Sequence, residues 1–359
     1  MSLTIFVSIP TLGIRRHSAS LERGVCLGEL LARVEERYPA LEGALRAREG
    51  GSLPDVHVYI NGRAIERGRV LRMPLHEDDE VALVPSLAGG GFGFSEEQIK
   101  RYSRQLILPE VGGKGQKKLL AARALVVGAG GLGSPVLAYL SAAGVGTIGI
   151  IDFDRVDRSN LQRQIIYRDE QVDRAKVLSA ADFVHALNPD VVVETHAGAL
   201  DASNAMELVG KYGVIVDGTD NFAARYVLND ACVLAGKPNV HGSVYRFDGQ
   251  ATVFLPGRGC YRCLYPVPPP PGLLPSCQEA GVLGVVPGVI GMIQATETLK
   301  LILGAGETLA GRLALYDALA MELRLVRIGR DPRCPVCGDD PSIIRVEDVA
   351  YACDEQGAQ

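Results

Sequence analysis

The chain has 359 residues, of which 47% are hydrophobic and 22% charged, and its formal net charge is −5. This is the composition of an ordinary globular protein, with enough residues for two domains. Basic and acidic residues are intermixed and form no Lys/Arg-rich block, so we expect no nucleic-acid partner. No apolar run reaches membrane-spanning length and the start lacks the layout of a signal peptide, so we expect no membrane and a cytoplasmic location.

Residues 1–91 are predicted to form a small α+β unit. Residues 3–9, 56–60 and 80–84 have the composition of strands, and residues 27–38 carry apolar side chains at helical spacing. The second of these strands runs into Asn61-Gly62, which predicts a tight hairpin. Gly89, Gly90 and Gly91 end the unit. Because glycine favours neither helix nor strand, they predict an extended tail or linker.

Alternating strands and helices begin after this linker, with a first helix from about Ser95. Ser95 and Gln98 have the spacing of a capping box. Strands are expected at 124–127, 147–151 and 214–216, with a helix after Gly133. This alternation predicts a doubly wound, Rossmann-like and mostly parallel sheet over residues 92–340, followed by a C-terminal tail at 341–359.

A glycine-rich motif follows the first of these strands and opens the helix. Its glycines are Gly128, Gly130, Gly131 and Gly133. Glycine is needed where the backbone approaches a phosphate closely, and the helix N-terminus offers N–H groups to the anion. Asp152 ends the next strand, where a ribose-hydroxyl acceptor is expected. A purely structural glycine turn is the alternative, and the motif alone does not distinguish NAD from ATP.

The segment that follows indicates ATP. Beyond Asp152 come Asp154, Asn160, Arg163, Gln164 and Lys176. Arginine and lysine near a phosphate cradle can hold the β- and γ-phosphates and neutralise charge as pyrophosphate leaves. Asp220 follows another buried strand, at the sheet edge that faces the ligand, and can hold Mg²⁺. The alternatives are surface charges at Arg163 and Lys176 and a helix-capping role for Asp220.

The motifs GAGGLGS, DFDRVDRSNLQRQ, DGTDN, CYRC and CPVC, together with the Lys176 segment, resemble the bacterial E1-like adenylyltransferases that activate sulfur carriers. The resemblance runs from Ser95 to about Gly338. It implies that Asp152 binds ribose, that Asn160, Arg163 and Lys176 hold the triphosphate, and that Asp220 binds Mg²⁺. It also implies a homodimer, because Arg104 is similar to an arginine that family members insert into the partner subunit's ATP site.

Two CxxC pairs predict a structural zinc ion. Cys260 and Cys263 form one pair, and Cys334 and Cys337 the other. Two intervening residues let both thiolates of a pair reach one tetrahedral Zn²⁺, and a site with four cysteines is closed to substrate. A redox-active pair is the alternative.

Cys277 stands apart from these pairs, after the proline-rich residues 266–275. We expect an exposed thiol on an extended loop, able to attack an acyl-adenylate. In the family that Ser95–Gly338 resembles, some members use a cysteine in this loop and others do not.

Residues 1–91 resemble the ubiquitin-like β-grasp sulfur carriers, which end in a double glycine. Here Gly89, Gly90 and Gly91 are internal, and an amide carbonyl cannot be adenylated. Either a processing protease cuts after Gly90 or Gly91 and releases a carrier, or the enzyme serves a separate carrier. A Gly-rich linker is a favourable site for such a cut.

The predicted reaction is adenylation of a carrier's C-terminal glycine carboxylate by ATP, with release of pyrophosphate. An external sulfur donor (a desulfurase, a rhodanese or sulfide) would then form the thiocarboxylate. Two alternatives are a non-catalytic scaffold of the same fold and an NAD-dependent oxidoreductase. The scaffold would be expected to have lost Arg163, Lys176 or Asp220, and all three are present.

Overall fold

The computed structural model describes residues 2–9, 14–22, 26–37, 56–65, 73–85, 94–269 and 281–349. These belong to two compact units, Met1–Lys118 and Leu119–Gln359, and each unit is described by itself. Gly89, Gly90, Gly91 and Cys277 lie outside the described residues.

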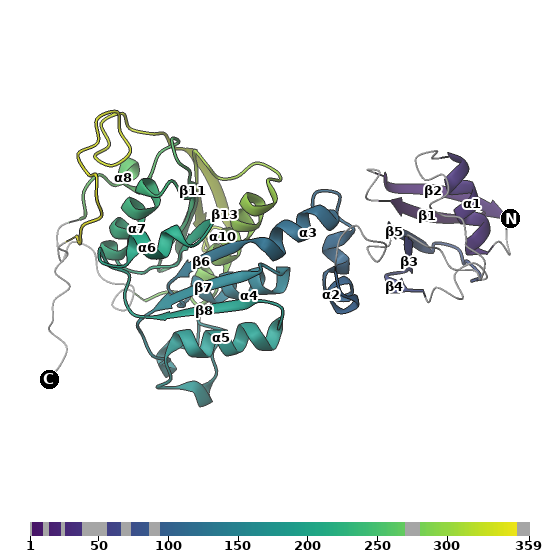
Figure 1. The fold of residues 1–359 in the computed structure, drawn as a ribbon, viewed down its shortest axis with the longest axis horizontal. Coiled ribbons are helices and arrows are strands. Elements are labelled where there is room, and N and C mark those ends of the chain that lie inside the picture. The colour runs from purple at the N-terminus through teal and green to yellow at the C-terminus, as the bar shows by residue number, and fades with distance from the viewer. Residues whose placement is uncertain are drawn as a thin grey trace. The chain divides into compact units, whose positions relative to one another are not determined.

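The first unit contains a five-stranded mixed sheet with the strand order β2-β1-β5-β3-β4 (Figure 1). Its elements are β1 (Ser2–Ile9), β2 (Ile14–Glu22), α1 (Leu27–Arg37), β3 (Val56–Ile60), β4 (Arg63–Ala64) and β5 (Glu80–Pro85). Strand β1 pairs antiparallel with β2 and parallel with β5. The apolar residues of α1 that the sequence singles out (Leu27, Leu30, Leu31 and Val34) are all buried. This arrangement confirms the expected β-grasp fold.

Asn61 and Gly62 form the predicted hairpin turn between β3 and β4. Both have positive φ angles, 50° and 76°, which is the requirement of a type I′ turn. Strand β2, in contrast, was missed by the sequence analysis. Its sequence IRRHSASLE has little β propensity, and it becomes a strand by pairing along the length of β1.

Two helices complete the first unit and lead into the second, α2 (Glu96–Leu106) and α3 (Gly112–Ala121). The side chain of Ser95 accepts a hydrogen bond from the backbone N–H of Gln98, whose own side chain accepts one from the N–H of Ser95. The predicted capping box is therefore confirmed.

The second unit is built on an eight-stranded sheet with the order β13-β12-β11-β10-β9-β6-β7-β8 (Figure 1). Its strands are β6 (Arg123–Val127), β7 (Thr147–Asp152), β8 (Val192–Ala197), β9 (Val214–Asp217), β10 (Asn239–Tyr245), β11 (Asp248–Phe254), β12 (Arg312–Asp317) and β13 (Glu322–Arg327). From β8 to β10 the strands are parallel, as predicted, and β11 to β13 add an antiparallel extension. The strand order reverses at β6, because β7 and β8 follow on one side of it and β9 and β10 on the other. An open α/β sheet binds its ligand at such a point.

Helices cover both faces of this sheet. They are α4 (Gly133–Ala143), α5 (Lys176–Leu187), α6 (Ala205–Gly210), α7 (Phe222–Leu234), α8 (Tyr261–Leu264) and α10 (Val285–Leu303). On β6, Val126 packs into a core with α4, α5 and α10. Its neighbours Leu125 and Val127 belong to a second core with α6 and α7. The alternation of side chains along a strand thus divides the core between the two faces.

Among the described residues, α10 alone is long and apolar enough to cross a membrane by length and composition. In this structure it packs against α4, β10 and β11, and its Val286 and Ile290 are fully buried. Gly291 is the point of closest approach, since a Cβ there would lie 2.5 Å from the carbonyl oxygen of Leu132.

Gly291→Ala should therefore destabilise the protein, although alanine normally makes a helix more stable than glycine does. We expect the free energy of unfolding to fall by about 1–3 kcal/mol, because the methyl group must displace backbone. Gly288→Ala in the same helix is the matched control, since its Cβ meets nothing within 4 Å. It should raise the stability by about 0.5–1 kcal/mol. Urea unfolding checks both, and equal stability of the two variants would contradict the close packing.

Candidate functional site

A cavity lies at the carboxyl ends of β6, β7 and β9, in the second unit. The residues predicted to bind the nucleotide surround it: Gly128, Gly130, Gly131, Asp152, Asp154, Asn160, Arg163, Gln164, Lys176 and Asp220. Gly133 is the first residue of α4, immediately behind the cavity. The structure thus brings together residues spread over about 90 positions of sequence, as an open sheet does at its switch point. Their individual roles stay predictions.

The glycine loop is shaped by the close approach of two backbones. Gly128 has a φ of +90°, and a Cβ there would lie 2.7 Å from the carbonyl oxygen of Gly218. A side chain at Gly133 would overlap the carbonyl oxygen of Gly128. Helix α4 begins without a side-chain cap. In its first turn Pro135 has no N–H and the Ser134 N–H donates to the carbonyl oxygen of Gly130, so the helix offers an anion chiefly its positive dipole end.

Asp152 connects the glycine loop to the end of β7. Its Oδ2 accepts a hydrogen bond from the Ala129 N–H at 2.8 Å, and its Oδ1 accepts one from the Asp154 N–H at 2.8 Å. Burial raises the pKa of this carboxyl group, although Lys176 and the two backbone N–H groups oppose that shift. Each carboxylate oxygen has a second lone pair, so the group can still accept from ribose hydroxyls while it holds the loop.

Lys176 is buried, with only 5% of its side chain exposed, and it is not a surface charge. Its Nζ lies 2.7 Å from Oδ2 of Asp154, whose side chain is 48% exposed. A buried lysine of this kind requires an anionic partner. Because an ammonium group has three N–H donors, Lys176 can keep Asp154 and still donate to a phosphate.

Asn160, Arg163 and Gln164 form a polar group on the opposite wall. Oδ1 of Asn160 accepts from Nε2 of Gln164 at 2.8 Å and from Nη2 of Arg163 at 3.4 Å. Oε1 of Gln164 is buried and has no hydrogen-bond partner among the described residues. An orphaned acceptor beside a cavity fits a ligand that brings a hydroxyl or amino donor, as a nucleoside does.

Asp220 is exposed at the mouth of the cavity, at the N-terminal side of α7. The suggestion that it caps this helix is wrong. Asn221 is the N-cap, and its Oδ1 accepts from the Ala224 N–H at 2.8 Å. The carboxylate of Asp220 is therefore not used by the helix, which leaves it suited to a hard divalent cation such as Mg²⁺.

Sequence reasoning missed three residues beneath this loop, Asp217, His241 and Arg225. Arg225 lines the cavity and donates from Nη2 to the carbonyl oxygen of Thr219 at 3.0 Å. Asp217 and His241 form a buried pair behind it. The one available signal was the first aspartate of DGTDN, Asp217, three residues before Asp220 at the strand end.

The four cysteines of the two CxxC pairs come together as predicted. Their sulfurs all lie within 4.8 Å of one another. Cys260 lies 3.9 Å from Cys263 and 3.6 Å from Cys334, and Cys263 lies 3.4 Å from Cys337. Sulfurs bound at about 2.3 Å to a tetrahedral zinc lie about 3.8 Å apart, so the residues fit that ion. Burial raises the pKa of the Cys260 thiol, a cost that a bound cation removes.

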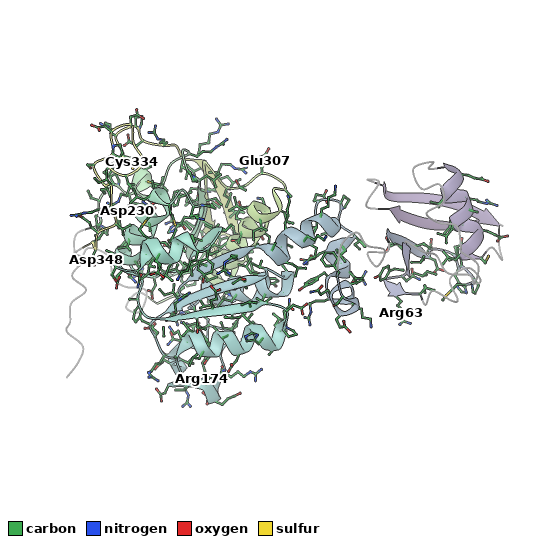
Figure 2. All side chains as sticks on the ribbon, viewed as in Figure 1. Arg63, Arg174, Asp230, Glu307, Cys334 and Asp348 are labelled. Atoms are coloured by element: carbon green, nitrogen blue, oxygen red, sulfur yellow. The ribbon has the colours of Figure 1, made fainter. Side chains whose placement is uncertain are left out.

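Helix α7 supports this metal centre. Oδ1 of Asn229 accepts from the Tyr261 N–H at 2.7 Å, within the first CxxC pair. Arg262, in the same pair, donates two N–H bonds of 2.7 Å to the buried carboxylate of Asp230 and lies over the ring of Tyr226. Figure 2 labels Asp230 on α7 and Cys334 in the second pair. Helix α7 thus begins beside Asp220, and its later turns hold the segment that carries the first CxxC pair.

Arg104 is exposed in the last turn of α2, in the first unit. All the other predicted site residues that the structure describes belong to the second unit. The role of Arg104 in the ATP site of a partner subunit stays a prediction.

The metal centre predicts the outcome of removing one thiolate. Cys337→Ser should lose the one zinc ion per chain and lower the Tm by about 10 °C or more, because a closed thiolate site contributes folding free energy. Cys232→Ala is the control, since Cys232, on α7, is buried in the core and is not one of the four clustered cysteines. It should keep full zinc. Metal analysis with thermal unfolding checks both, and zinc retained in Cys337→Ser would contradict this assignment.

Two family matches divide the chain. Residues 102–336 match the ThiF family, and residues 12–90 match the ThiS family. The first match contains the cavity and three of the four cysteines, with Cys337 one residue beyond its end, and the second contains β2 to β5 of the β-grasp unit.

Individual relatives agree with these matches. The chain is 52% identical to the sulfur carrier protein adenylyltransferase of Thermus thermophilus over 266 residues, which are 72% of this chain and 98% of the relative. It is 51% identical to the SAMP-activating enzyme E1 of Haloferax volcanii over 254 residues, 71% of this chain and 94% of the relative. It is 55% identical to the probable adenylyltransferase/sulfurtransferase MoeZ of Mycobacterium tuberculosis over 257 residues, 70% of this chain and 66% of that protein.

Among solved structures, E. coli MccB is similar with a TM-score of 0.61 and 23% identity, over 72% of this chain and 76% of that one. At this identity the likeness supports the fold. The family matches and the sequence relatives go beyond the fold. They show that the chain belongs to the ThiF family of E1-like adenylyltransferases, with a ThiS-family ubiquitin-like domain preceding the enzyme domain.

Proposed function

We propose that this enzyme uses ATP to adenylate the C-terminal glycine carboxylate of a ubiquitin-like sulfur carrier. In the reaction a carboxylate oxygen of the carrier attacks the α-phosphorus, the bond from that phosphorus to the β-phosphate oxygen breaks, and pyrophosphate leaves. The product is an acyl-adenylate, which a sulfur donor converts to a thiocarboxylate with release of AMP. ATP-dependent adenylation is the activity of the family, and the carrier follows from the names of the relatives and from the ThiS match.

The observation that carries this proposal is the grouping of a helix N-terminus, a buried lysine, an arginine and an exposed carboxylate around one cavity. A hydride-transfer enzyme needs a nucleotide cradle but has no use for cations beside the terminal phosphates. An enzyme that expels pyrophosphate needs them, because negative charge develops on the leaving group. The NAD alternative and the non-catalytic alternative both leave this grouping without a purpose.

Each residue then has a role. Asp152 accepts the ribose hydroxyls, while Asn160, Arg163 and Lys176 hold the triphosphate, with Gln164 positioning Asn160. Asp154 keeps Lys176 extended toward the cavity. Asp220 holds Mg²⁺, which supplies a counter-charge to the phosphates. The four cysteines hold Zn²⁺ as a structural ion, remote from the reacting atoms.

The carrier is either the chain's own residues 1–91 after cleavage or a separate protein. The glycines 89–91 are internal, so the fused domain becomes a substrate only when a protease exposes the carboxylate of Gly90 or Gly91. The ThiS match ends at residue 90 and the ThiF match begins at 102, which supports a domain boundary near 91–92. Compactness alone divides the chain at Lys118. The enzyme domain would then run from 92 to 340, before the tail at 341–359.

Further partners complete the proposal. A homodimer would let Arg104 of each subunit reach the other's triphosphate. An external sulfur donor (a desulfurase, a rhodanese or sulfide) would supply sulfur, and Cys277 would relay it or hold the carrier as a thioester or acyl disulfide. These steps belong in the cytoplasm, where thiols stay reduced.

The role of Asp220 is tested by ATP–pyrophosphate exchange. Asp220→Asn should lower the exchange rate about 100-fold or more, because the metal loses a charged ligand. Asp190→Asn removes an exposed carboxylate before β8, outside the cavity, and should leave exchange unchanged. The exchange should also require a carrier with a free Gly-Gly carboxylate and vanish when one residue is appended. Full exchange by Asp220→Asn would overturn the assignment.

Cys277 is tested by separating activation from sulfur transfer. Cys277→Ala should leave ATP–pyrophosphate exchange intact, since adenylation needs no enzyme thiol. Thiocarboxylate formation from a protein persulfide donor should fall, because the relay or the holding thioester is lost. Cys353→Ala, in the C-terminal tail, is the control and should change neither. Collapse of exchange in Cys277→Ala would place the thiol in the ATP site, and no change in either assay would remove it from the mechanism.

A further inference from the structure

A buried acid–imidazole pair lies beneath the loop that carries Asp220. Asp217 ends β9 and His241 lies on the neighbouring strand β10, and their side chains are each 1% exposed. Nδ1 of His241 lies 2.7 Å from Oδ2 of Asp217. A carboxylate can only accept, so the imidazole carries its proton on Nδ1.

Asp217 holds the following loop in place through hydrogen bonds. Its Oδ1 accepts from the backbone N–H of Thr219 at 3.1 Å and from the Thr219 hydroxyl at 2.7 Å. Its backbone carbonyl accepts from Nε2 of Gln294 at 2.7 Å. The Gly218 N–H donates to the carbonyl of Val127. Every residue from Asp217 to Thr219 is thus held, and the next residue, Asp220, extends its carboxylate to the cavity.

His241 is itself held on its other side. Its ring lies 5.1 Å from that of Tyr261 and 5.9 Å from that of Phe254, measured between centroids. Its Nε2 is buried and has no hydrogen-bond partner among the described residues. An apolar side chain would avoid this orphaned nitrogen, but it would leave Oδ2 of the buried Asp217 carboxylate without its donor, which costs more.

The electrostatics agree with this geometry. Burial alone would raise the pKa of the Asp217 carboxyl group, but the hydrogen bonds from His241 and Thr219 and the charge of Arg225 hold it below its ordinary value. Asp217 is therefore a stable anion that accepts hydrogen bonds on both oxygens. A rigid anchor of this kind limits where Asp220 can place its own oxygens.

We propose that His241 is a positioning residue for the magnesium site. Through Asp217 it fixes the loop of residues 217–220, so that the Asp220 carboxylate meets the cation at low cost. Loss of its N–H should therefore raise the Mg²⁺ concentration that the enzyme requires, with little effect on the rate at saturating Mg²⁺. This inference rests on the proposed role of Asp220.

Two variants separate the hydrogen bond from the volume of the side chain. Nδ2 of an asparagine takes approximately the position of Nδ1 of the histidine, so His241→Asn keeps the donor, whereas His241→Leu removes it. In ATP–pyrophosphate exchange measured against Mg²⁺ concentration, His241→Leu should raise the half-saturating concentration about 10- to 100-fold, as expected for one charge-assisted hydrogen bond. His241→Asn should stay within about threefold of the wild type.

A matched histidine provides the control. His196 on β8 contacts the hydroxyl of Tyr212 through Nε2 at 3.0 Å, in a cluster with Glu194 and Arg123 outside the cavity. His196→Leu should leave the Mg²⁺ dependence unchanged. Zinc content and the melting temperature are measured for every variant, so that unfolding is recognised.

The outcomes are distinct. An unchanged half-saturating Mg²⁺ concentration in His241→Leu, or an equal shift in His241→Asn, overturns the inference. If the His241 inference fails but Asp220→Asn abolishes exchange in the same assay, the proposed function still stands. If Asp220→Asn keeps its exchange activity, the proposed role of Asp220 is itself wrong. Should His241→Leu not fold, ¹⁵N NMR of the wild-type imidazole decides the question. A proton on Nδ1 supports the inference, and a proton on Nε2 alone overturns it.

Discussion

The contact between the two backbone loops at Gly128 and Gly218 is the constraint on which the site depends. The loops follow β6 and β9, the adjacent strands at which the sheet reverses its order. Because no side chain separates them, the N-terminus of α4 and the N-terminus of α7 open onto the same cavity. The first contributes the positive end of its helix dipole, and the second follows directly after the carboxylate of Asp220. An alanine at Gly128 would need both an unfavourable φ angle and a displaced carbonyl group, so the constraint is a property of the backbone.

Helix α7 connects the cavity to the four-cysteine cluster. Its N-terminal side holds Asp220 and Asn221, and its later turns hold Asn229 and Asp230, which bind the first CxxC segment. Tyr261, between the first two cysteines, packs against His241. A zinc ion on the four cysteines would therefore do more than tie residue 337 to residue 260. It would also hold the aromatic wall behind the Asp217–His241 pair, although none of the four cysteines lines the nucleotide cavity.

The sequence identified the parts of the site that are local and left out those that are not. The glycine motif, the strand-end aspartates and the CxxC pairs each occupy a few consecutive residues, and the structure places them together. Strands β2 and β13 form by hairpin pairing with the strand just before each, and β11 pairs with the distant β12, so their own composition did not reveal them. The Asp217–His241 pair joins residues 24 positions apart on neighbouring strands, and nothing in either segment alone specifies that contact.

The charges around the cavity are consistent with the proposed need for a metal ion. Its lining includes three carboxylates, Asp152, Asp154 and Asp220, and three cations, Arg163, Lys176 and Arg225. Two of the cations are already committed, because Lys176 pairs with Asp154 and Arg225 donates to Thr219. A bare triphosphate would bring several negative charges into a site with no excess of positive charge to meet them. A divalent ion on Asp220, as proposed, would change that balance, and its position would then matter as much as its charge, since Coulomb energies vary steeply at contact distances. This is why a buried histidine that never touches the nucleotide is expected to affect the concentration of Mg²⁺ at which the enzyme works.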